Sequence, residues 1–241
     1  MQALTDKIAV VTGASSGIGR AIALELAAQG AALCLVGRKL ETLEAVAEIA
    51  RETAPKVVSY CTDLTVDEDI WKIQACLQQD FGRVDILIHS AGVISMGKLQ
   101  NVSVHELDWQ YRANVHAPYV LTQALLPMLL SCQGQIVFIN SSVIMGSGAN
   151  VGQFAATQHA LRAIADSLRE EVNADYVRVL SVFPGRTATP RQGLIHELEG
   201  KEYHPERLLQ PQDVATVVLN ALCLPRSAEV TDIRVRPFKK A

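Results

Sequence analysis

The sequence has no long hydrophobic run and no marked excess of one charge. Because no run approaches the length of a membrane span, we expect no membrane segment. The 25 acidic and 22 basic residues leave a net charge of -3, which offers no electrostatic footprint for nucleic acid. Residues 1–7 lead directly into an apolar stretch, so we also expect no signal segment and a cytoplasmic location.

The cysteines lack the spacing of a metal site, and their total is odd. Three of them lie in apolar periodic stretches, where a reduced cysteine behaves as a small buried hydrophobe. We therefore predict a protein without disulfides and without a structural metal ion. The five are Cys34, Cys61, Cys76, Cys132 and Cys223.

The chain also lacks internal repeats, low-complexity tracts and an interdomain linker. At 241 residues it is long enough for one large α/β domain and short for two. We therefore predict that residues 1–241 form a single domain.

Short apolar, β-branched runs alternate along the chain with helical patterns. Each run is almost continuously apolar, as a strand covered on both faces requires. This order predicts a doubly wound parallel sheet of the Rossmann type, with about seven strands and helices on both faces. The predicted strands are residues 8–12, 32–37, 57–61, 84–89, 135–140, 177–183 and, at the edge, 233–235. The predicted helices are residues 20–29, 40–53, 66–81, 103–130, 152–173 and 211–223.

Residues 185–210 form the least regular segment, rich in Thr, Pro, His and charge. An ordered loop of that length within a compact domain is usually functional. We therefore expect a substrate loop that closes over the site as a lid.

A glycine-rich turn joins the first predicted strand to the first predicted helix. Glycines permit a tight turn and let the backbone approach a pyrophosphate, whose charge the helix N-terminus favours. Because the turn stands between a strand and a helix, it predicts nucleotide binding. The residues predicted to contact the nucleotide are Gly13, Ser15, Ser16, Gly17, Ile18 and Gly19.

The residues after the second predicted strand indicate which cofactor binds. An acidic residue there would hydrogen-bond a free ribose 2′-hydroxyl, whereas a basic residue accommodates a 2′-phosphate. The chain has Arg38 and Lys39 at this place and no acidic residue before Glu41. The pattern therefore favours NADP(H) over NAD(H), with Ser15 as a further donor to the same phosphate.

With these motifs the sequence resembles the short-chain dehydrogenase/reductase family. The glycine turn looks like that family's cofactor turn, and further landmarks follow in order from about residue 7 to the C-terminus. Asp63 and Leu64 resemble the pair that contacts adenine. The segment Ser90, Ala91 and Gly92 stands where the family has Asn-Ala-Gly, with one residue changed.

Three more segments extend the resemblance toward the active site. Asn114 resembles the family's active-site Asn, and Ser142, rather than Ser141, resembles its catalytic Ser. The resemblance implies an oxidoreductase that acts on a small molecule and assembles as a homodimer or homotetramer through helices 103–130 and 152–173. The loop that resembles the holder of the nicotinamide carboxamide includes Pro184, Gly185, Thr187 and Thr189.

Two catalytic positions depart from the family. Where the family has a proton-donating Tyr and, four residues later, a Lys, this chain has Phe154 and Gln158. The spacing still brings both side chains to one face of a helix. However, Phe donates no proton, and Gln binds a ribose hydroxyl without shifting a pKa by its charge. A positioned general acid contributes roughly 10²- to 10⁴-fold in rate, so we expect carbonyl reduction to be weak.

No other side chain in the sequence stands at the position of the missing proton donor. His159 follows Gln158 but points about 100° away around the helix, so a surface position is expected. His196 and His204 lie in the irregular segment, where they either face the substrate or are exposed to solvent.

Three interpretations follow from this pattern. The first is an NADP(H)-dependent oxidoreductase whose substrate does not need the Tyr, such as a protonated imine or a double bond protonated by water. The second is a non-catalytic, nucleotide-binding relative that regulates or scaffolds a partner. The third is a ketoreductase whose active site has been deliberately disabled. Fold resemblance does not decide among them, because function depends on the site.

Overall fold

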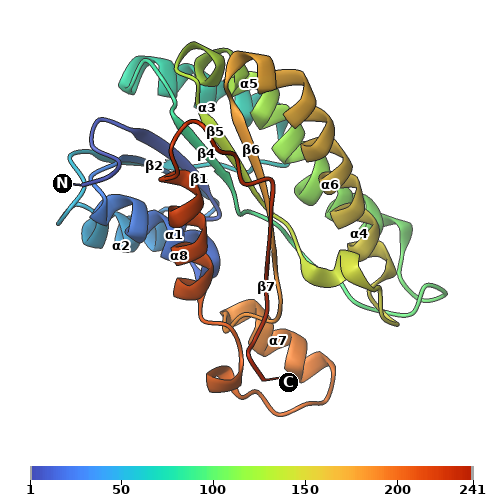
Figure 1. The fold of residues 1–241 in the computed structure, drawn as a ribbon. Coiled ribbons are helices and arrows are strands. Elements are labelled where there is room, and N and C mark those ends of the chain that lie inside the picture. The colour runs from blue at the N-terminus through green and yellow to red at the C-terminus, as the bar shows by residue number, and fades with distance from the viewer. Residues whose placement is uncertain (1, 240–241) are drawn as a thin grey trace.

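The apolar runs form a seven-stranded parallel sheet in the computed structural model, which describes residues 2–239 (Figure 1). The strand order is β3-β2-β1-β4-β5-β6-β7, and every neighbouring pair runs parallel. This confirms the predicted doubly wound fold. The strands are β1 (Ile8–Thr12), β2 (Ala32–Gly37), β3 (Val57–Cys61), β4 (Ile86–His89), β5 (Gln135–Ile139), β6 (Arg178–Pro184) and β7 (Asp232–Val235).

Helices cover both faces of the sheet (Figure 1). On one face lie α1 (Gly17–Ala28), α2 (Leu40–Ala50) and α8 (Pro211–Leu222); on the other lie α3 (Asp67–Asp80), α5 (Ala117–Ser131) and α6 (Gly152–Val172). Successive strand side chains alternate between the two layers. Val11 packs with the first layer and Val10 with the second, and both are fully buried. This two-sided burial explains why the strands are continuously apolar.

The helix predicted over residues 103–130 is interrupted. It consists of α4 (Val104–Tyr111), a π-helical turn (Arg112–His116) and α5. In the π-turn the Ala117 N–H donates to the carbonyl of Arg112, five residues earlier. Pro118 has no N–H to offer the carbonyl of Asn114, four residues earlier, so regular α-helical bonding fails at that point.

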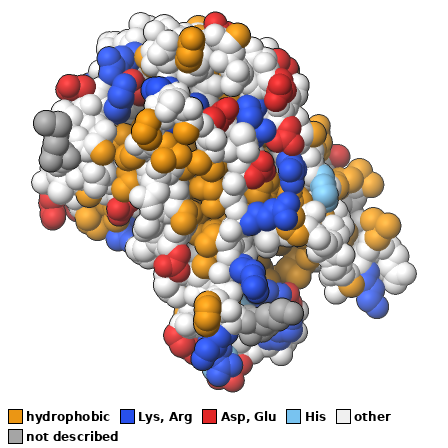
Figure 2. Space-filling view, viewed as in Figure 1, with side chains coloured by type: hydrophobic (Ala, Val, Ile, Leu, Met, Phe, Trp, Pro, Cys, Tyr) orange, Lys and Arg blue, Asp and Glu red, His pale blue; other side chains and the backbone are white. Residues whose placement is uncertain are grey.

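The segment 185–210 is more regular than predicted. It contains α7 (Pro190–Leu198) and a short 3-10 turn (Pro205–Arg207). Thr189 caps α7, because its side-chain oxygen accepts a hydrogen bond from the Gln192 N–H at 3.2 Å. The expectation of an irregular loop was therefore wrong for these residues. The segment stands out from the body beside β7 (Figure 1), and its outer surface carries acidic and basic side chains (Figure 2).

The cysteines are less buried than their apolar surroundings predicted. Cys34, in β2, is buried, whereas Cys132 is half-buried. Cys61, Cys76 and Cys223 are exposed, because each lies at the end of an element or on a helix face turned to solvent.

Within residues 2–239, no helix has both the length and the apolar composition needed to cross a membrane. The same residues contain no cluster of three or more His, Cys, Asp or Glu side chains placed to hold a metal ion.

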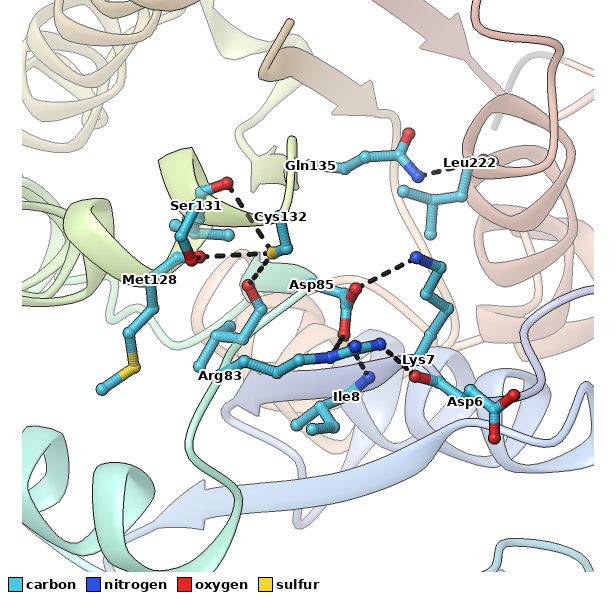
Figure 3. Close-up of polar contacts among 12 residues, drawn as sticks. Asp6, Lys7, Ile8, Arg83, Asp85, Met128, Ser131, Cys132, Gln135 and Leu222 are labelled. Carbon is cyan, nitrogen blue, oxygen red and sulfur yellow. Dashed lines mark hydrogen bonds and ion pairs between the residues drawn. The ribbon is translucent and has the colours of Figure 1, made fainter. Parts of the chain in front are cut away.

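A buried carboxylate fastens the edge of the sheet opposite the carboxyl ends of its strands (Figure 3). Asp85 is 3% exposed and accepts hydrogen bonds from Lys7 Nζ at 3.0 Å, the Ile8 N–H at 3.0 Å and Arg83 Nε at 2.9 Å. Arg83 also donates to the carbonyl of Asp6. The network joins the start of β1 to the start of β4.

We predict that Asp85→Asn lowers the free energy of unfolding by about 2–3 kcal/mol. The amide nitrogen of Asn would face N–H groups whose hydrogen bonds the Asp85 carboxylate now accepts. Urea denaturation at fixed protein concentration measures the change. Asp69→Asn is the control: its ion pair with Lys72 is open to solvent, so its loss should change the free energy of unfolding much less. Equal effects of the two substitutions would contradict this account of Asp85.

Candidate active site

A cleft of about 700 Å³ opens at the carboxyl ends of β1, β4, β5 and β6. Here the strand order reverses between β1 and β4, and such switch points bind ligands in doubly wound sheets. The predicted site residues that line the cleft are Gly13, Ser15, Ser16, Gly17, Ile18, Gly19, Arg38, Asp63, Leu64, Ser90, Ala91, Gly92, Asn114, Ser142, Phe154, Gln158, Pro184, Gly185, Thr187 and Thr189.

Lys39 is the exception among the predicted residues. It is exposed, precedes α2 as its N-cap residue and is not part of the cleft lining. Its backbone is extended, with φ at -124° and ψ at 110°, and successive side chains in extended backbone point to opposite sides. The structure therefore brings Arg38 to the cleft and turns Lys39 away from it.

The glycine turn packs its backbone too tightly for side chains. Gly13 and Gly17 have φ of +65° and +55°, a region that favours glycine. A Cβ at Gly19 would lie 2.4 Å from the Gly13 carbonyl oxygen. Ser16 begins α1 without a side-chain capping bond, which leaves the first N–H groups of the helix without a side-chain acceptor. These features fit a bound pyrophosphate.

The hydroxyl of Thr12 ties the end of β1 to the end of β4. Its oxygen accepts hydrogen bonds from the N–H groups of Ser90 at 3.0 Å and Ala91 at 3.1 Å, and it donates to the carbonyl of Ile88 at 3.2 Å. This arrangement fixes the segment 90–92 as one wall of the cleft, next to the glycine turn.

Asp63 and Arg38 form the end of the cleft beyond β2 and β3. Burial raises the pKa of Asp63, but hydrogen bonds from the backbone and side chain of Thr65, and then the charge of Arg38, lower that pKa more. The net pKa is below its usual value, so Asp63 is ionised near neutral pH.

Asn114 lies in the π-turn, and its side chain is fully engaged. Its amide nitrogen donates to the carbonyl of Val93 at 2.9 Å and to Thr157 Oγ1 at 3.1 Å, and its oxygen accepts from the Val93 N–H at 2.7 Å. The side chain thus joins the helix to the segment after β4 and to α6. Pro118 leaves the backbone carbonyl of Asn114 without its α-helical donor.

The serine doublet after β5 divides into two roles. Ser141 Oγ accepts a hydrogen bond from the Val143 N–H at 3.2 Å and so caps a short 3-10 turn (Ser142–Met145). Ser142 lines the cleft and makes no side-chain hydrogen bond with the described residues. The geometry leaves the Ser142 hydroxyl available to a ligand.

Phe154 and Gln158 lie four residues apart near the start of α6, and both line the cleft. Asn140 Nδ2 donates to the Gln158 carbonyl at 3.0 Å, which anchors this turn of the helix to the end of β5. The Gln158 side chain is buried and forms no hydrogen bond within residues 2–239. Its amide is therefore free to bind a ligand in the cleft.

The described cleft lining contains no tyrosine and no lysine. Its ionisable groups are also unsuited to donate a proton near neutral pH. Burial lowers the pKa of His89 to about 3, so that His89 is neutral. Hydrogen bonding to Arg186, followed by a bond to Lys201, lowers the pKa of Glu199 to about 2. Since Asp63 is also ionised, the carboxylates of the lining carry no proton.

The histidines that the sequence suggested as alternatives do not supply a proton donor to the cleft. His159 is exposed, as expected for a surface residue. His196 is buried, with its ring bonded to Gln192 and packed edge-on against Tyr203, so neither expectation for it was right. His204 is about one-third exposed and lies between two exposed glutamates.

The lining residues that sequence reasoning missed include His89, Trp109 and Arg191. His89 directly precedes the segment 90–92, and its ring stacks on Phe138 and bonds to Thr122. Its place beside a recognised motif was a usable signal. Trp109 and Arg191 come from α4 and α7, and only the tertiary packing brings these helices to the cleft.

Comparisons with known proteins agree with this geometry. Residues 7–199 match the short chain dehydrogenase family. An uncharacterized oxidoreductase of Staphylococcus aureus is 37% identical over 239 residues, which cover 98% of this chain and all of that protein.

Two solved structures are similar over nearly their full length. The alcohol dehydrogenase of the archaeon Thermococcus sibiricus, in complex with 5-hydroxy-NADP, has a TM-score of 0.88 at 28% identity, covering 98% of each chain. A metagenomic short-chain oxidoreductase in complex with NADP has a TM-score of 0.85 at 29% identity, covering 99% of this chain and 100% of its own. With its seven-stranded parallel sheet, its glycine-turn cleft and these matches, the chain belongs to the short-chain dehydrogenase/reductase family of oxidoreductases.

Proposed function

We propose that this protein is an NADP(H)-dependent oxidoreductase with an atypical active site, which reduces a substrate that needs no protein proton donor. The observation that carries the proposal is the absence of tyrosine and lysine from the described cleft lining. Phe154 and Gln158 take the places where the family has its Tyr and Lys. A protonated imine, or a similar group that already carries its proton, is the substrate class that suits such a site.

The residues of the cleft divide the remaining work among them. When bound, NADPH supplies the hydride. The Ser142 hydroxyl is free to hydrogen-bond the substrate's heteroatom, and the Gln158 amide is free to bind a ribose hydroxyl. Phe154 presents an apolar ring that excludes water from the reacting group. Reduction of a ketone by this site would need a proton from water, whereas reduction of an iminium ion is complete once hydride reaches carbon.

The preference for NADP(H) rests on Arg38, which lines the cleft at the end of β2. The segment from Arg38 to α2 offers no carboxylate for a free 2′-hydroxyl. The complexes of the two similar structures with 5-hydroxy-NADP and NADP support this preference.

Arg38→Ala should weaken NADPH binding about 10- to 100-fold and leave NADH binding within about twofold, because only NADPH carries the 2′-phosphate that the guanidinium would bind. Fluorescence titration of both cofactors measures the effect. Arg51→Ala is the control, since Arg51 lies at the far end of α2 and pairs with Glu44. Equal affinity of the parent protein for both cofactors would refute the preference.

Phe154→Tyr combined with Gln158→Lys should create NADPH-dependent ketone reduction, with a rate increase on the order of 10²- to 10⁴-fold over the parent. Each single substitution should do little. A Tyr without the cation keeps a pKa near 10, and a Lys without the Tyr has no acid to tune. Steady-state rates on a ketone panel, with both single variants as controls, test this non-additivity.

Two results would count against the proposal. If the double variant binds NADPH tightly but reduces no ketone, the pocket departs from a reductase beyond these two positions, which favours the non-catalytic alternative. If the parent already reduces ketones at ordinary rates, another group donates the proton and Phe154 is not the decisive change.

The segment 185–210 is proposed to close over the nicotinamide end of the cofactor. Its base is fixed at the bridge between Thr187 and Leu209, where the Ala188 N–H donates to the Leu209 carbonyl at 2.7 Å and the Leu209 N–H donates to the Arg186 carbonyl at 3.1 Å. Hydrogen exchange should show α7 to be weakly protected alone and more protected with NADPH, with α8 as the internal control. High protection of α7 that is unchanged by cofactor would rule out closure.

A further inference from the structure

Arg191 reaches across the cleft from α7 to the body of the protein. It is the second residue of α7 and lines the cleft. Its guanidinium donates to the carbonyl oxygen of Gly92, in the wall that follows β4. The Arg191 side chain therefore connects the projecting segment 185–210 to the cleft wall formed by residues 90–92.

No carboxylate within residues 2–239 lies at ion-pair distance from Arg191. The neighbouring Arg186, by contrast, pairs with Glu199 at 2.6 Å. The surrounding protein, and then the positive charge of Arg38, lower the pKa of Arg191. Of the three arginines that line the cleft, Arg38 and Arg191 thus have no carboxylate partner within residues 2–239, and Arg191 has only a neutral carbonyl as its acceptor. This excess of positive charge suits a ligand with more than one anionic group.

The start of α7 packs against the glycine turn. A Cβ at Gly17 would lie 3.0 Å from Thr189 Cγ2. Arg191 follows Thr189 by two residues, and it lines the same cleft as Gly17, Ile18 and Gly19, whose N–H groups begin α1. Those N–H groups suit a pyrophosphate, and Arg38 stands farther along the cleft, beyond β2.

We propose that Arg191 binds the pyrophosphate of the dinucleotide. This inference rests on the proposed binding of NADP(H). On binding, the guanidinium exchanges the neutral carbonyl of Gly92 for phosphate oxygens. A charged pair forms stronger hydrogen bonds than a neutral acceptor does, and the planar fork of arginine suits a phosphate. The exchange also links α7 to the cofactor, so that the dinucleotide takes over from Gly92 in holding the projecting segment to the body.

Ligands that contain only part of the dinucleotide test this assignment by calorimetric titration, without turnover. Arg191→Met should weaken NADPH, NADH and ADP-ribose on the order of 10- to 100-fold, because all three contain the pyrophosphate. Adenosine 2′-monophosphate, which lacks it, should bind within about twofold of the parent affinity. Arg38→Ala should give the opposite pattern, with NADPH and adenosine 2′-monophosphate weakened and ADP-ribose unchanged.

Two further variants separate this role from a structural one. Arg191→Lys should recover part of the ADP-ribose affinity, since it restores the charge without the fork. Arg207→Met removes an exposed arginine from the same projecting segment and should change no affinity.

The outcomes distinguish the two proposals. If Arg191→Met leaves ADP-ribose affinity unchanged, or weakens adenosine 2′-monophosphate as much as ADP-ribose, the inference is overturned while NADP(H) binding stands. A parent protein that binds neither NADPH nor ADP-ribose overturns both. Because only binding is measured, an enzyme inactive on every substrate tried can still confirm the role of Arg191.

Discussion

The close approach of three backbone segments around Gly13 is the constraint on which the cleft depends. A Cβ at Gly13 would lie 2.9 Å from the Cα of Ala91, and one at Gly19 would lie 2.4 Å from the Gly13 carbonyl oxygen. The hydroxyl of Thr12 then fixes the end of β1 to the segment after β4. Because the chain departs in opposite directions from these two strands, a crevice opens above the contact. The other site residues are arranged around this crevice by the strands and helices that end there.

The two halves of the cleft differ in the functional groups that they contain. The half that faces the glycine turn has an open helix N-terminus and two arginines, which are the groups that a phosphorylated nucleotide requires. The other half has the Ser142 hydroxyl, the Gln158 amide and the Phe154 ring. Its nearby ionisable groups are committed elsewhere: Glu199 is held ionised by Arg186, and His89 is kept neutral by burial. Under the proposed function, this cleft would bind a hydride donor without a proton donor among its described lining residues, and it would therefore restrict the substrate rather than the cofactor.

Much of the fold could be predicted from the sequence, because two-sided burial leaves a direct trace. Strands such as β1 and β2 are continuously apolar, and their predicted bounds agree with the structure. The glycine turn was also recognisable, since its residue types follow from local backbone requirements, and the segment 90–92 was recognised by its resemblance to the family's motif. Features that depend on tertiary contacts were not. The π-turn at Asn114 arises from Pro118 together with bonds to Val93 and Thr157, and α7 depends on its Thr189 cap and its packing on Gly17. Arg191 was missed and Lys39 was wrongly included for the same reason. The direction of each side chain decides whether its charge reaches the cleft, and that direction depends on the tertiary structure.

Hydride transfer to a substrate that needs no proton tests the central claim most directly. An N-methylated cyclic iminium ion carries a permanent charge, and the ketone with the same ring is its matched partner. Stopped-flow measurement of NADPH oxidation should show that the parent protein reduces the iminium ion at least 10²-fold faster than the ketone, after correction for the uncatalysed reactions. Reduction of the ketone at a comparable catalysed rate would contradict the account, because it would require a proton donor in the cleft.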